Sequence, residues 1–338
     1  MRQPFITARG KKHVSRNLLV QVALSNGTTG IGEASASLAW KTETLAVMTR
    51  CVTAVAAQWR SRPVAEAWAV IGHAWDAPWA SPAALSALEC ALATAEAQAN
   101  GRPLWRALAG RLGMTRARPR RIMTSLTISA WPREIAARAA GRAAHQGFRQ
   151  LKVKVTGRDP DEDLARVLLV HQAAPAATLL VDANQGFSAR GALAFARAIR
   201  LLKLPVVLFE QPVPADDLDG LRALTRDAGI PIAVDESLRS ARDARRLIQR
   251  RAAHCFNVKL AKSGLLGTLE ITRLARRAHL TLMLGCMAES AVGLAPSVHL
   301  ACGTGLFTYV DLDSHLLVRG PRATAFQTRG PRLWVNAS

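Results

Sequence analysis

Short runs rich in β-type residues recur at a nearly constant interval through the last two thirds of the chain, and this repeat constrains the fold most. Consecutive runs begin about 24 to 29 residues apart. The runs are 122–128, 151–155, 179–182, 206–210, 232–235, 256–260, 281–285 and 308–312. Amphipathic segments typical of helices separate them, such as 160–173, 189–202 and 240–251. Eight strands alternating with helices at this spacing predict parallel βα units that close into a barrel of the TIM type.

An open, doubly wound sheet with helices on both faces would show the same alternation. That fold binds dinucleotides through a glycine-rich turn after its first strand. No such turn follows any of the eight runs. The barrel is therefore the favoured interpretation.

The first 115 residues have a different character. Alternating segments at 18–24 and 30–34 flank a Ser-Asn-Gly turn, as in a meander of short strands. A long alanine-rich stretch from 82 to 100 has helical composition and is ended by a glycine and a proline. Strands followed by helices predict a small α+β domain ahead of the barrel.

Three consecutive strands of the predicted barrel end in one carboxylate each: Asp182, Glu210 and Asp235. The active site of such a barrel lies at the C-terminal ends of its strands, so these side chains converge. Converging carboxylates repel one another unless a cation neutralises them. An all-oxygen site suits Mg²⁺, which makes these residues predicted metal ligands. A single aspartate at a strand end is more often a helix cap, but caps do not explain the ordered set.

Lysines flank these three strands. Lys152 and Lys154 lie on the strand before them, and Lys259 on the strand after them. Only eight of the 45 basic residues are lysines, and four of the eight fall in the segments KVK and KLAK. Arginine does not release its proton usefully, whereas lysine acts as a base once its pKa is lowered. The pattern predicts proton transfer by lysine, although a KVK strand alone is also typical of an exposed sheet edge.

Seven short motifs contain or adjoin these residues. They are KVK (152–154), DAN (182–184), FEQP (209–212), DES (235–237), NVKLAKSG (257–264), GCMAES (285–290) and VDLD (310–313). With these motifs the chain resembles the muconate-lactonising-enzyme subgroup of the enolase superfamily, from about Phe5 to Val318. The resemblance implies a (β/α)7β barrel at 116–315. It also implies an α+β capping domain made of 1–115 and completed by 316–338.

The resemblance further implies the roles of the site residues. Asp182, Glu210 and Asp235 would bind Mg²⁺, while Lys154 and Lys259 would be an acid–base pair on opposite faces of the substrate. The hydrogen next to a carboxylate is very weakly acidic, and Mg²⁺ would stabilise the enediolate that deprotonation forms. One lysine would remove the proton and the other would return one to the far face.

Three further residues of these motifs are expected to support the reaction, and a fourth is not. Lys152 would lower the pKa of Lys154 by like-charge repulsion and contact the substrate carboxylate. Asn184 and Glu236 are expected beside the ligands, with Glu236 orienting or tuning the second lysine of the pair. Lys262 lies beyond the predicted strand and is expected to be structural.

Residues of the eighth predicted strand narrow the class of substrate. Asp311 and Asp313 are two residues apart, so both are predicted to face the barrel interior. VDLDSHLLV resembles the motif of dipeptide epimerases, in which such a pair receives the substrate's free ammonium group. Thr127 on the first strand is a predicted wall residue. The predicted function is Mg²⁺-dependent epimerisation of a dipeptide at the Cα of its C-terminal residue.

Sister reactions on the same scaffold are alternatives: o-succinylbenzoate synthesis, N-acyl amino acid racemisation and muconate cycloisomerisation. The pair Asp311 and Asp313 argues against them, because two carboxylates favour a cationic group of the substrate.

The capping region leaves the side-chain preference open. Arg9 and Lys12 lie in a basic segment that resembles one in epimerases of acidic dipeptides, and both are predicted to contact the substrate. Ala39 stands where epimerases of Ala-Glu have an anion-binding arginine. Lys41 is an alternative anion contact, whereas Trp40 suits an apolar side chain.

The net charge of +21 raises the question of a nucleic-acid partner. Arginine is scattered through the whole chain, and the densest run, 102–121, holds seven arginines and no acid. A solvated helix end and linker is favoured for this run over a binding site for an anionic partner. A basic anion- or nucleic-acid-binding protein is a remote alternative.

Composition also predicts the compartment. The five cysteines are widely spaced without a CxxC motif, so reduced thiols in the cytoplasm are expected. No apolar stretch reaches the length of a membrane span, and the start of the chain lacks the apolar core of a signal peptide. A homo-oligomer is expected from the family.

Overall fold

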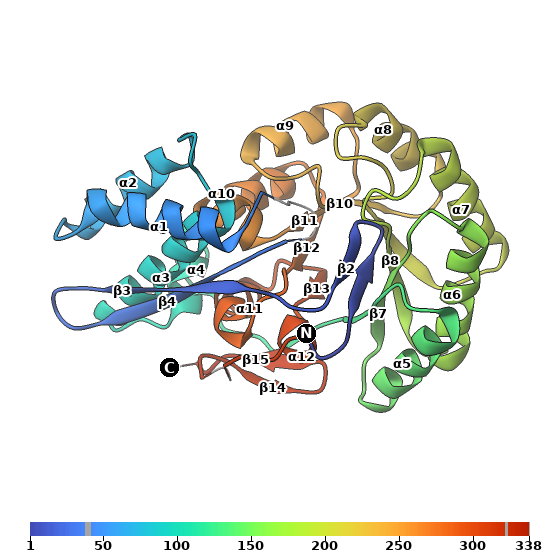
Figure 1. Cartoon of the computed structure of the whole chain (residues 1–338), viewed down its shortest axis with the longest axis horizontal. Coiled ribbons are helices and arrows are strands. Elements are labelled where there is room, and N and C mark those ends of the chain that lie inside the picture. The colour runs from blue at the N-terminus through green and yellow to red at the C-terminus, as the bar shows by residue number, and fades with distance from the viewer. Residues whose placement is uncertain (38–41, 322–323, 338) are drawn as a thin grey trace.

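Eight parallel strands form one curved sheet at the centre of this computed structural model, which describes residues 1–37, 42–321 and 324–337. In chain order they are β6 (Leu126–Ile128), β7 (Gln150–Lys154), β8 (Thr178–Asp182), β9 (Val206–Glu210), β10 (Ile232–Val234), β11 (Cys255–Val258), β12 (Thr281–Gly285) and β13 (Tyr309–Asp311). Seven helices connect them: α5 (Arg133–His145), α6 (Pro160–Ala173), α7 (Ala189–Leu201), α8 (Leu218–Asp227), α9 (Ala241–Arg250), α10 (Leu260–Arg277) and α11 (Ala291–Thr304). The helices surround the strands (Figure 1), which confirms the predicted (β/α)7β barrel.

The barrel closes between its first and last strands through polar contacts. The backbone N–H of Ser125 donates to the carbonyl of Val310 at 2.8 Å. The backbone N–H of Leu312 donates to Thr124 Oγ1 at 2.8 Å. The sequence predicts one strand over 122–128, but the structure has two short strands there, β5 (Ile122–Met123) and β6. The first of them, β5, pairs antiparallel with β15 (Arg332–Trp334) outside the barrel.

Side chains alternate between two apolar layers along each barrel strand. On β8, Leu179 and Val181 belong to the large core between strands and helices. Leu180 belongs to a small separate core with Leu208 and three further side chains from β10, β11 and β12. Asp182 has the same parity as Leu180, so it points into the barrel interior at the C-terminal end. Because side chains alternate along each strand, polar residues such as Asp182 lie inside the barrel at its C-terminal end.

An α+β unit precedes the barrel. It contains the antiparallel pairs β1 (Phe5–Thr7) with β2 (Gly10–Lys12) and β3 (Asn17–Ala23) with β4 (Thr29–Ser35), followed by α1 (Leu45–Trp59), α2 (Val64–Ala74), α3 (Pro82–Ala99) and α4 (Leu104–Arg111). Two glycines let β4 lie directly on α3. A Cβ at Gly30 would lie 2.0 Å from the Ala91 carbonyl oxygen, and one at Gly32 would lie 1.9 Å from that of Ala87.

The β1–β2 hairpin leaves this unit and lies across the barrel (dark blue in Figure 1). The backbone N–H of Ile6 donates to Ser129 Oγ at 2.5 Å, and that of Ala130 donates to the Ile6 carbonyl at 3.0 Å. Both partners directly follow β6. The hairpin is therefore fixed over the C-terminal ends of the strands.

The C-terminal tail contains α12 (Ser314–Leu317), β14 (Gln327–Arg329) and β15. Phe326, Leu333 and Val335 pack into the barrel core, and so do buried side chains of α4. The strands β3 and β4 form a second core with α1, α2 and part of α3. We propose a boundary near residue 115. The prediction that 316–338 completes the capping domain stays a proposal. The described residues contain no helix that is both long enough and apolar enough to cross a membrane.

Candidate active site

Acidic side chains line the mouth of the barrel at the ends of neighbouring strands. Asp182 and Glu210 are the last residues of β8 and β9, and Asp235 directly follows β10. The register aligns Lys154 with Asp182 and Asp182 with Glu210 across the sheet. All three predicted ligands are buried. The strand order thus brings together residues that lie far apart in the sequence.

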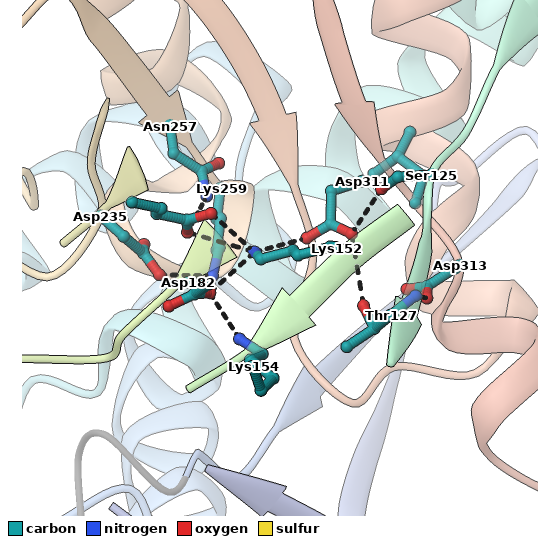
Figure 2. A network of polar contacts seen from close by, with 12 residues as sticks. Ser125, Thr127, Lys152, Lys154, Asp182, Asp235, Asn257, Lys259, Asp311 and Asp313 are labelled. Atoms are coloured by element: carbon teal, nitrogen blue, oxygen red, sulfur yellow. Dashed lines mark hydrogen bonds and ion pairs between the residues drawn. The ribbon is translucent and has the colours of Figure 1, made fainter. Parts of the chain in front are cut away.

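Lys152 occupies the centre of this acidic cluster (Figure 2). Its Nζ lies 3.0 Å from Asp182 Oδ2, 2.9 Å from Glu210 Oε2 and 2.8 Å from Asp311 Oδ2. Burial alone would lower the pKa of Lys152, but the carboxylates, led by Asp311, outweigh burial and hold that pKa well above its usual value. Lys152 is therefore the resident counter-ion of these carboxylates, a role that the sequence did not predict.

The other two predicted lysines lie on either side of the carboxylate-bearing strands. Lys154 Nζ donates to Asp182 Oδ2 at 2.5 Å, and Lys259 Nζ donates to Asp235 Oδ2 at 2.7 Å. Lys154 belongs to β7 and Lys259 follows β11, so β8, β9 and β10 separate them in the sheet. Burial opposes the charge on Lys259, yet Asp235 outweighs it and raises the pKa of Lys259.

Several buried oxygen atoms of the site lack a hydrogen-bond partner among the described residues. They are Asn184 Oδ1, Glu236 Oε2 and Asn257 Oδ1. Burial and then Asp182 raise the pKa of Glu210 to about 7, and burial and then Asp235 raise that of Glu236 to about 7. Buried oxygens without donors, together with carboxylates that resist ionisation, indicate a shortage of positive charge. The donor set therefore fits a hard divalent cation.

In the described residues, no group of three His, Cys, Asp or Glu side chains is already gathered at metal-binding spacing. The lysine ammonium groups account for this. Lys152 lies between Asp182 and Glu210, and Lys259 and Lys262 both bind Asp235.

Asp311 and Asp313 lie on the opposite wall, beside the first strand. Ser125 Oγ donates to Asp311 Oδ1 at 3.0 Å, and the backbone N–H of Thr127 donates to Asp313 Oδ2 at 2.6 Å. Asp311 also binds Lys152. Burial and then Asp311 raise the pKa of Asp313 to about 7. Both carboxylates border the cavity, as predicted, and Asp311 has more partners than Asp313.

Residues behind the carboxylates hold them in place. Asn184 Nδ2 donates to Glu236 Oε1 at 3.3 Å. The expected orienting or tuning of Lys259 by Glu236 stays a prediction. Lys262 lies in α10, past the strand as predicted, and donates to Asp235 Oδ1 at 2.6 Å. Its structural role is thereby tied directly to a predicted ligand.

Sequence reasoning missed two supporting amides. Asn257 Nδ2 donates to Glu210 Oε1 at 2.7 Å, and Gln211 Oε1 accepts the backbone N–H of Asp235 at 2.9 Å. Asn257 precedes Lys259 by two residues and so shares its face of the strand, which is a usable signal. Gln211 has a left-handed backbone, φ 36°, directly after Glu210, and nothing in the sequence indicated this.

The hairpin of the N-terminal unit forms the outer wall of the cavity, which holds about 100 Å³. Arg9 borders the cavity from the hairpin turn but is exposed. Lys12 Nζ donates to the Ala36 carbonyl at 2.5 Å, and burial lowers the pKa of Lys12 to about 8. Lys154 lies 5.8 Å from the centre of the Phe5 ring. Ala39, Trp40 and Lys41 lie outside the described residues.

The fold and this site define a class of protein. Residues 134–333 match the family described as "Enolase C-terminal domain-like", and residues 1–109 match "Mandelate racemase / muconate lactonizing enzyme, N-terminal domain". The chain belongs to this mandelate racemase and muconate lactonizing enzyme family of the enolase superfamily.

Relatives over nearly the whole chain are named as epimerases. An "Aromatic dipeptide epimerase" of Herpetosiphon aurantiacus is 35% identical, with 94% of this chain and 87% of the relative covered. An "L-Ala-D/L-Glu epimerase" of Thermotoga maritima is 33% identical, with 98% and 94% covered. A crystal structure of the dipeptide epimerase of Methylococcus capsulatus, complexed with Mg and L-Arg-D-Lys, has a TM-score of 0.89 and 31% identity, with 99% and 94% covered.

Proposed function

We propose that this protein is a Mg²⁺-dependent dipeptide epimerase that inverts the Cα of the substrate's C-terminal residue. The observation that carries the proposal is the placement of Lys154 and Lys259 on opposite sides of three carboxylate-bearing strands. Both ammonium groups are tied to those carboxylates, at 2.5 Å and 2.7 Å. The names of the relatives and their complexes with Mg and dipeptides support the same reaction.

Asp182, Glu210 and Asp235 would hold the metal. When bound, Mg²⁺ supplies positive charge that stabilises the enediolate form of the substrate carboxylate. The raised pKa of Glu210 and the buried oxygens of Asn184, Glu236 and Asn257 that lack a donor support this assignment.

The two lysines divide the proton transfer between them. In one direction Lys259 removes the Cα proton in its neutral form, while Lys154 donates a proton to the opposite face; in the other direction the roles exchange. In the structure Asp235 holds Lys259 in its charged form, so Lys259 becomes a base only when that ion pair weakens. Lys152 stays protonated and offsets the negative charge of Asp311 and its neighbours.

Asp313 receives the substrate's ammonium group in this proposal. Its neighbour Asp311 already binds Lys152 and Ser125, whereas the hydrogen bonds that Asp313 accepts come from Thr127. A second carboxylate with spare lone pairs is suited to an ammonium ion. A substrate without a free amine would leave it buried and unpaired, which argues against the sister reactions.

We further propose that the epimerised residue carries an acidic side chain. Arg9 and Lys12 border the cavity, and among the described residues neither forms an ion pair with a carboxylate. A partly buried lysine without a counter-ion favours an anionic ligand. Exchange of L-Ala-L-Glu should then exceed that of L-Ala-L-Gln, and Lys12→Met should remove the difference. Equal rates for both peptides in the unmodified protein would overturn this specificity.

The cytoplasmic location and the homo-oligomer also stay proposals. The free state of all five cysteines supports the first. Sedimentation of the purified protein decides the second.

The function is tested by hydrogen exchange. The protein is incubated with Mg²⁺ and pooled L,L-dipeptides, or with the corresponding L,D-dipeptides, in D₂O, and mass spectrometry reads the gain of one deuterium at the C-terminal Cα. We expect exchange that is lost with EDTA and, for one epimer each, with Lys154→Ala or Lys259→Ala. Lys203→Ala, at an exposed site, is the matched control. Exchange of N-acyl amino acids without exchange of dipeptides would assign a sister reaction instead.

A further inference from the structure

Helix α10 is broken close to its start, five residues after the reacting Lys259. Gly264 has φ 68° and ψ 178°, which are not helical values. The turn from Leu260 to Ser263 is thereby separated from the longer part of the helix. The second part begins with N–H groups that have no carbonyl partner in a preceding turn. Its first N–H groups belong to Leu265 and Leu266.

Glu89, in α3 of the N-terminal unit, accepts these hydrogen bonds. Its Oε2 accepts the backbone N–H of Leu266 at 3.0 Å, and the N–H of Leu265 also bonds to this carboxylate. Its Oε1 accepts Trp75 Nε1–H at 2.8 Å. Glu89 is 2% exposed and forms no ion pair within 4 Å among the described residues. The start of a helix carries partial positive charge, so it stabilises a buried carboxylate that lacks a cation.

The break and the carboxylate fit each other closely. A Cβ at position 264 would lie 2.6 Å from Glu89 Oε2 and 2.6 Å from Trp75 Cζ2. Glycine is thus required at this position both for its positive φ and for the space that Glu89 fills.

A short series of side-chain contacts connects the segment that Glu89 binds to Lys259. Lys262, in the turn before the break, donates to Asp235 Oδ1 at 2.6 Å. Asp235 Oδ2 accepts from Lys259 Nζ at 2.7 Å. Lys154 instead lies on β7 and binds Asp182. Glu89 therefore supports the segment that bears Lys259 and has no such link to Lys154.

A second carboxylate of the same unit provides a natural comparison. Glu33 of β4 accepts the backbone N–H of Ser290 at 2.8 Å and that of Gly293 at 3.1 Å, at the start of α11. It is also buried, at 6% exposure. This helix start carries no lysine. Glu33 and Glu89 thus make the same kind of contact between the two units, but only Glu89 leads to a proton-transferring side chain.

We propose that Glu89 is a positioning residue for Lys259: it fixes the break in α10 and thereby sets the place of one of the two bases. The inference rests on the proposed function. Glu89, a side chain of the N-terminal unit, would therefore affect proton transfer on the one face of the substrate that Lys259 serves.

The test measures Cα hydrogen exchange in D₂O separately from each epimer of one dipeptide substrate. In Glu89→Gln we expect exchange of the epimer served by Lys259 to fall at least tenfold more than exchange of the other epimer. The epimer served by Lys259 is the one that Lys259→Ala silences. Gly264→Ala, which displaces Glu89 from the other side, should give the same asymmetry. Glu33→Gln should slow both epimers by the same factor.

Each outcome decides. Equal losses for both epimers in Glu89→Gln, with a thermal midpoint lowered as in Glu33→Gln, would make Glu89 a general contact between the units and overturn the proposal. Unchanged exchange in Glu89→Gln would overturn it as well. Absence of exchange in the unmodified protein would instead overturn the proposed function, so the two failures are distinguishable.

Discussion

At the scale of single residues, the site is organised around one lysine. Lys152 is 1% exposed and lies within 3.0 Å of three carboxylates. The predicted tuning of Lys154 by Lys152 stays a prediction, and the structure adds that Lys152 is the counter-ion of the acidic cluster. Removing one partner from a buried ion network leaves the others unpaired, which costs more than the pair itself contributes.

Lys152→Met should therefore lower the free energy of unfolding in EDTA by about 3–5 kcal/mol. Urea denaturation measures the change. Lys203→Met, at an exposed position, should change it by no more than about 0.5 kcal/mol. A loss below about 1 kcal/mol in Lys152→Met would show that the cluster is neutralised in another way.

Asp313→Asn should raise KM for dipeptides with a free amine by about 10- to 150-fold, because a hydrogen bond to a charged group is worth about 1.5–3 kcal/mol. KM for the same dipeptide with an acetylated amine should not rise. Steady-state kinetics with the two substrates separates an ammonium contact from a general defect. A parallel rise for both peptides would exclude the ammonium contact.

At the scale of elements, the N-terminal unit contacts the barrel where helices begin. Glu33 and Glu89 cap two such starts, and Glu289 lies beside the first of them. Glu289 is 5% exposed, and burial together with Glu33 raises the pKa of Glu289 to about 8. This junction therefore holds one carboxylate that stays protonated at neutral pH.

Glu289 makes the stability of the protein depend on pH. The folded pKa of about 8 exceeds the ordinary value of 4.5, so the folded state binds the extra proton between these values. The contribution of Glu289 to the free energy of unfolding is therefore greatest at low pH. It falls as pH rises from about 4.5 to 8, by roughly 1.4 kcal/mol per pH unit within that window. Urea midpoints from pH 5 to 9 should lose this slope in Glu289→Gln. The same slope in both proteins would contradict the prediction.

The positions of the barrel strands and of the residues at their C-terminal ends were predictable. Both depend on local sequence: the strands on hydrophobic periodicity, and the ends on the positions of Asp182, Glu210 and Asp235. Helix boundaries such as Pro160–Ala173 also agreed with the sequence. The division of 122–128 was not predictable, since it depends on β15, which lies some 200 residues away. The break at Gly264 and the amides of Asn257 and Gln211 depend on tertiary contacts for the same reason.

At the scale of the whole molecule, some of the arginines behind the net charge of +21 make contacts within the protein itself. Within the arginine-rich run 102–121, Arg111 binds Glu96 at 3.0 Å and lies 4.8 Å from the centre of the Trp68 ring. Arg121 lies 5.5 Å from the centre of the Trp334 ring. Part of the run thus packs against the protein itself, which supports the structural interpretation of these arginines.

Binding to DNA should accordingly be weak and independent of sequence. Retention on immobilised duplexes at about 50 mM salt should disappear by about 200 mM, because counterion release dominates such contacts. Two unrelated duplexes compared by fluorescence anisotropy should give the same affinity. A preference of 10³-fold or more for one sequence would instead indicate a specific partner.

The scarcity of lysine has a practical consequence for chemical modification. Lys152, Lys154, Lys259 and Lys262 are all at most 6% exposed. Lys11 and Lys203 are exposed among the described residues. Amine-directed reagents will therefore label few lysine side chains of the described residues in the folded protein, and the four buried lysines should be spared. A fluorophore or surface anchor attached through Lys203 should leave turnover intact, and the appearance of buried lysines among the labelled sites will report unfolding directly.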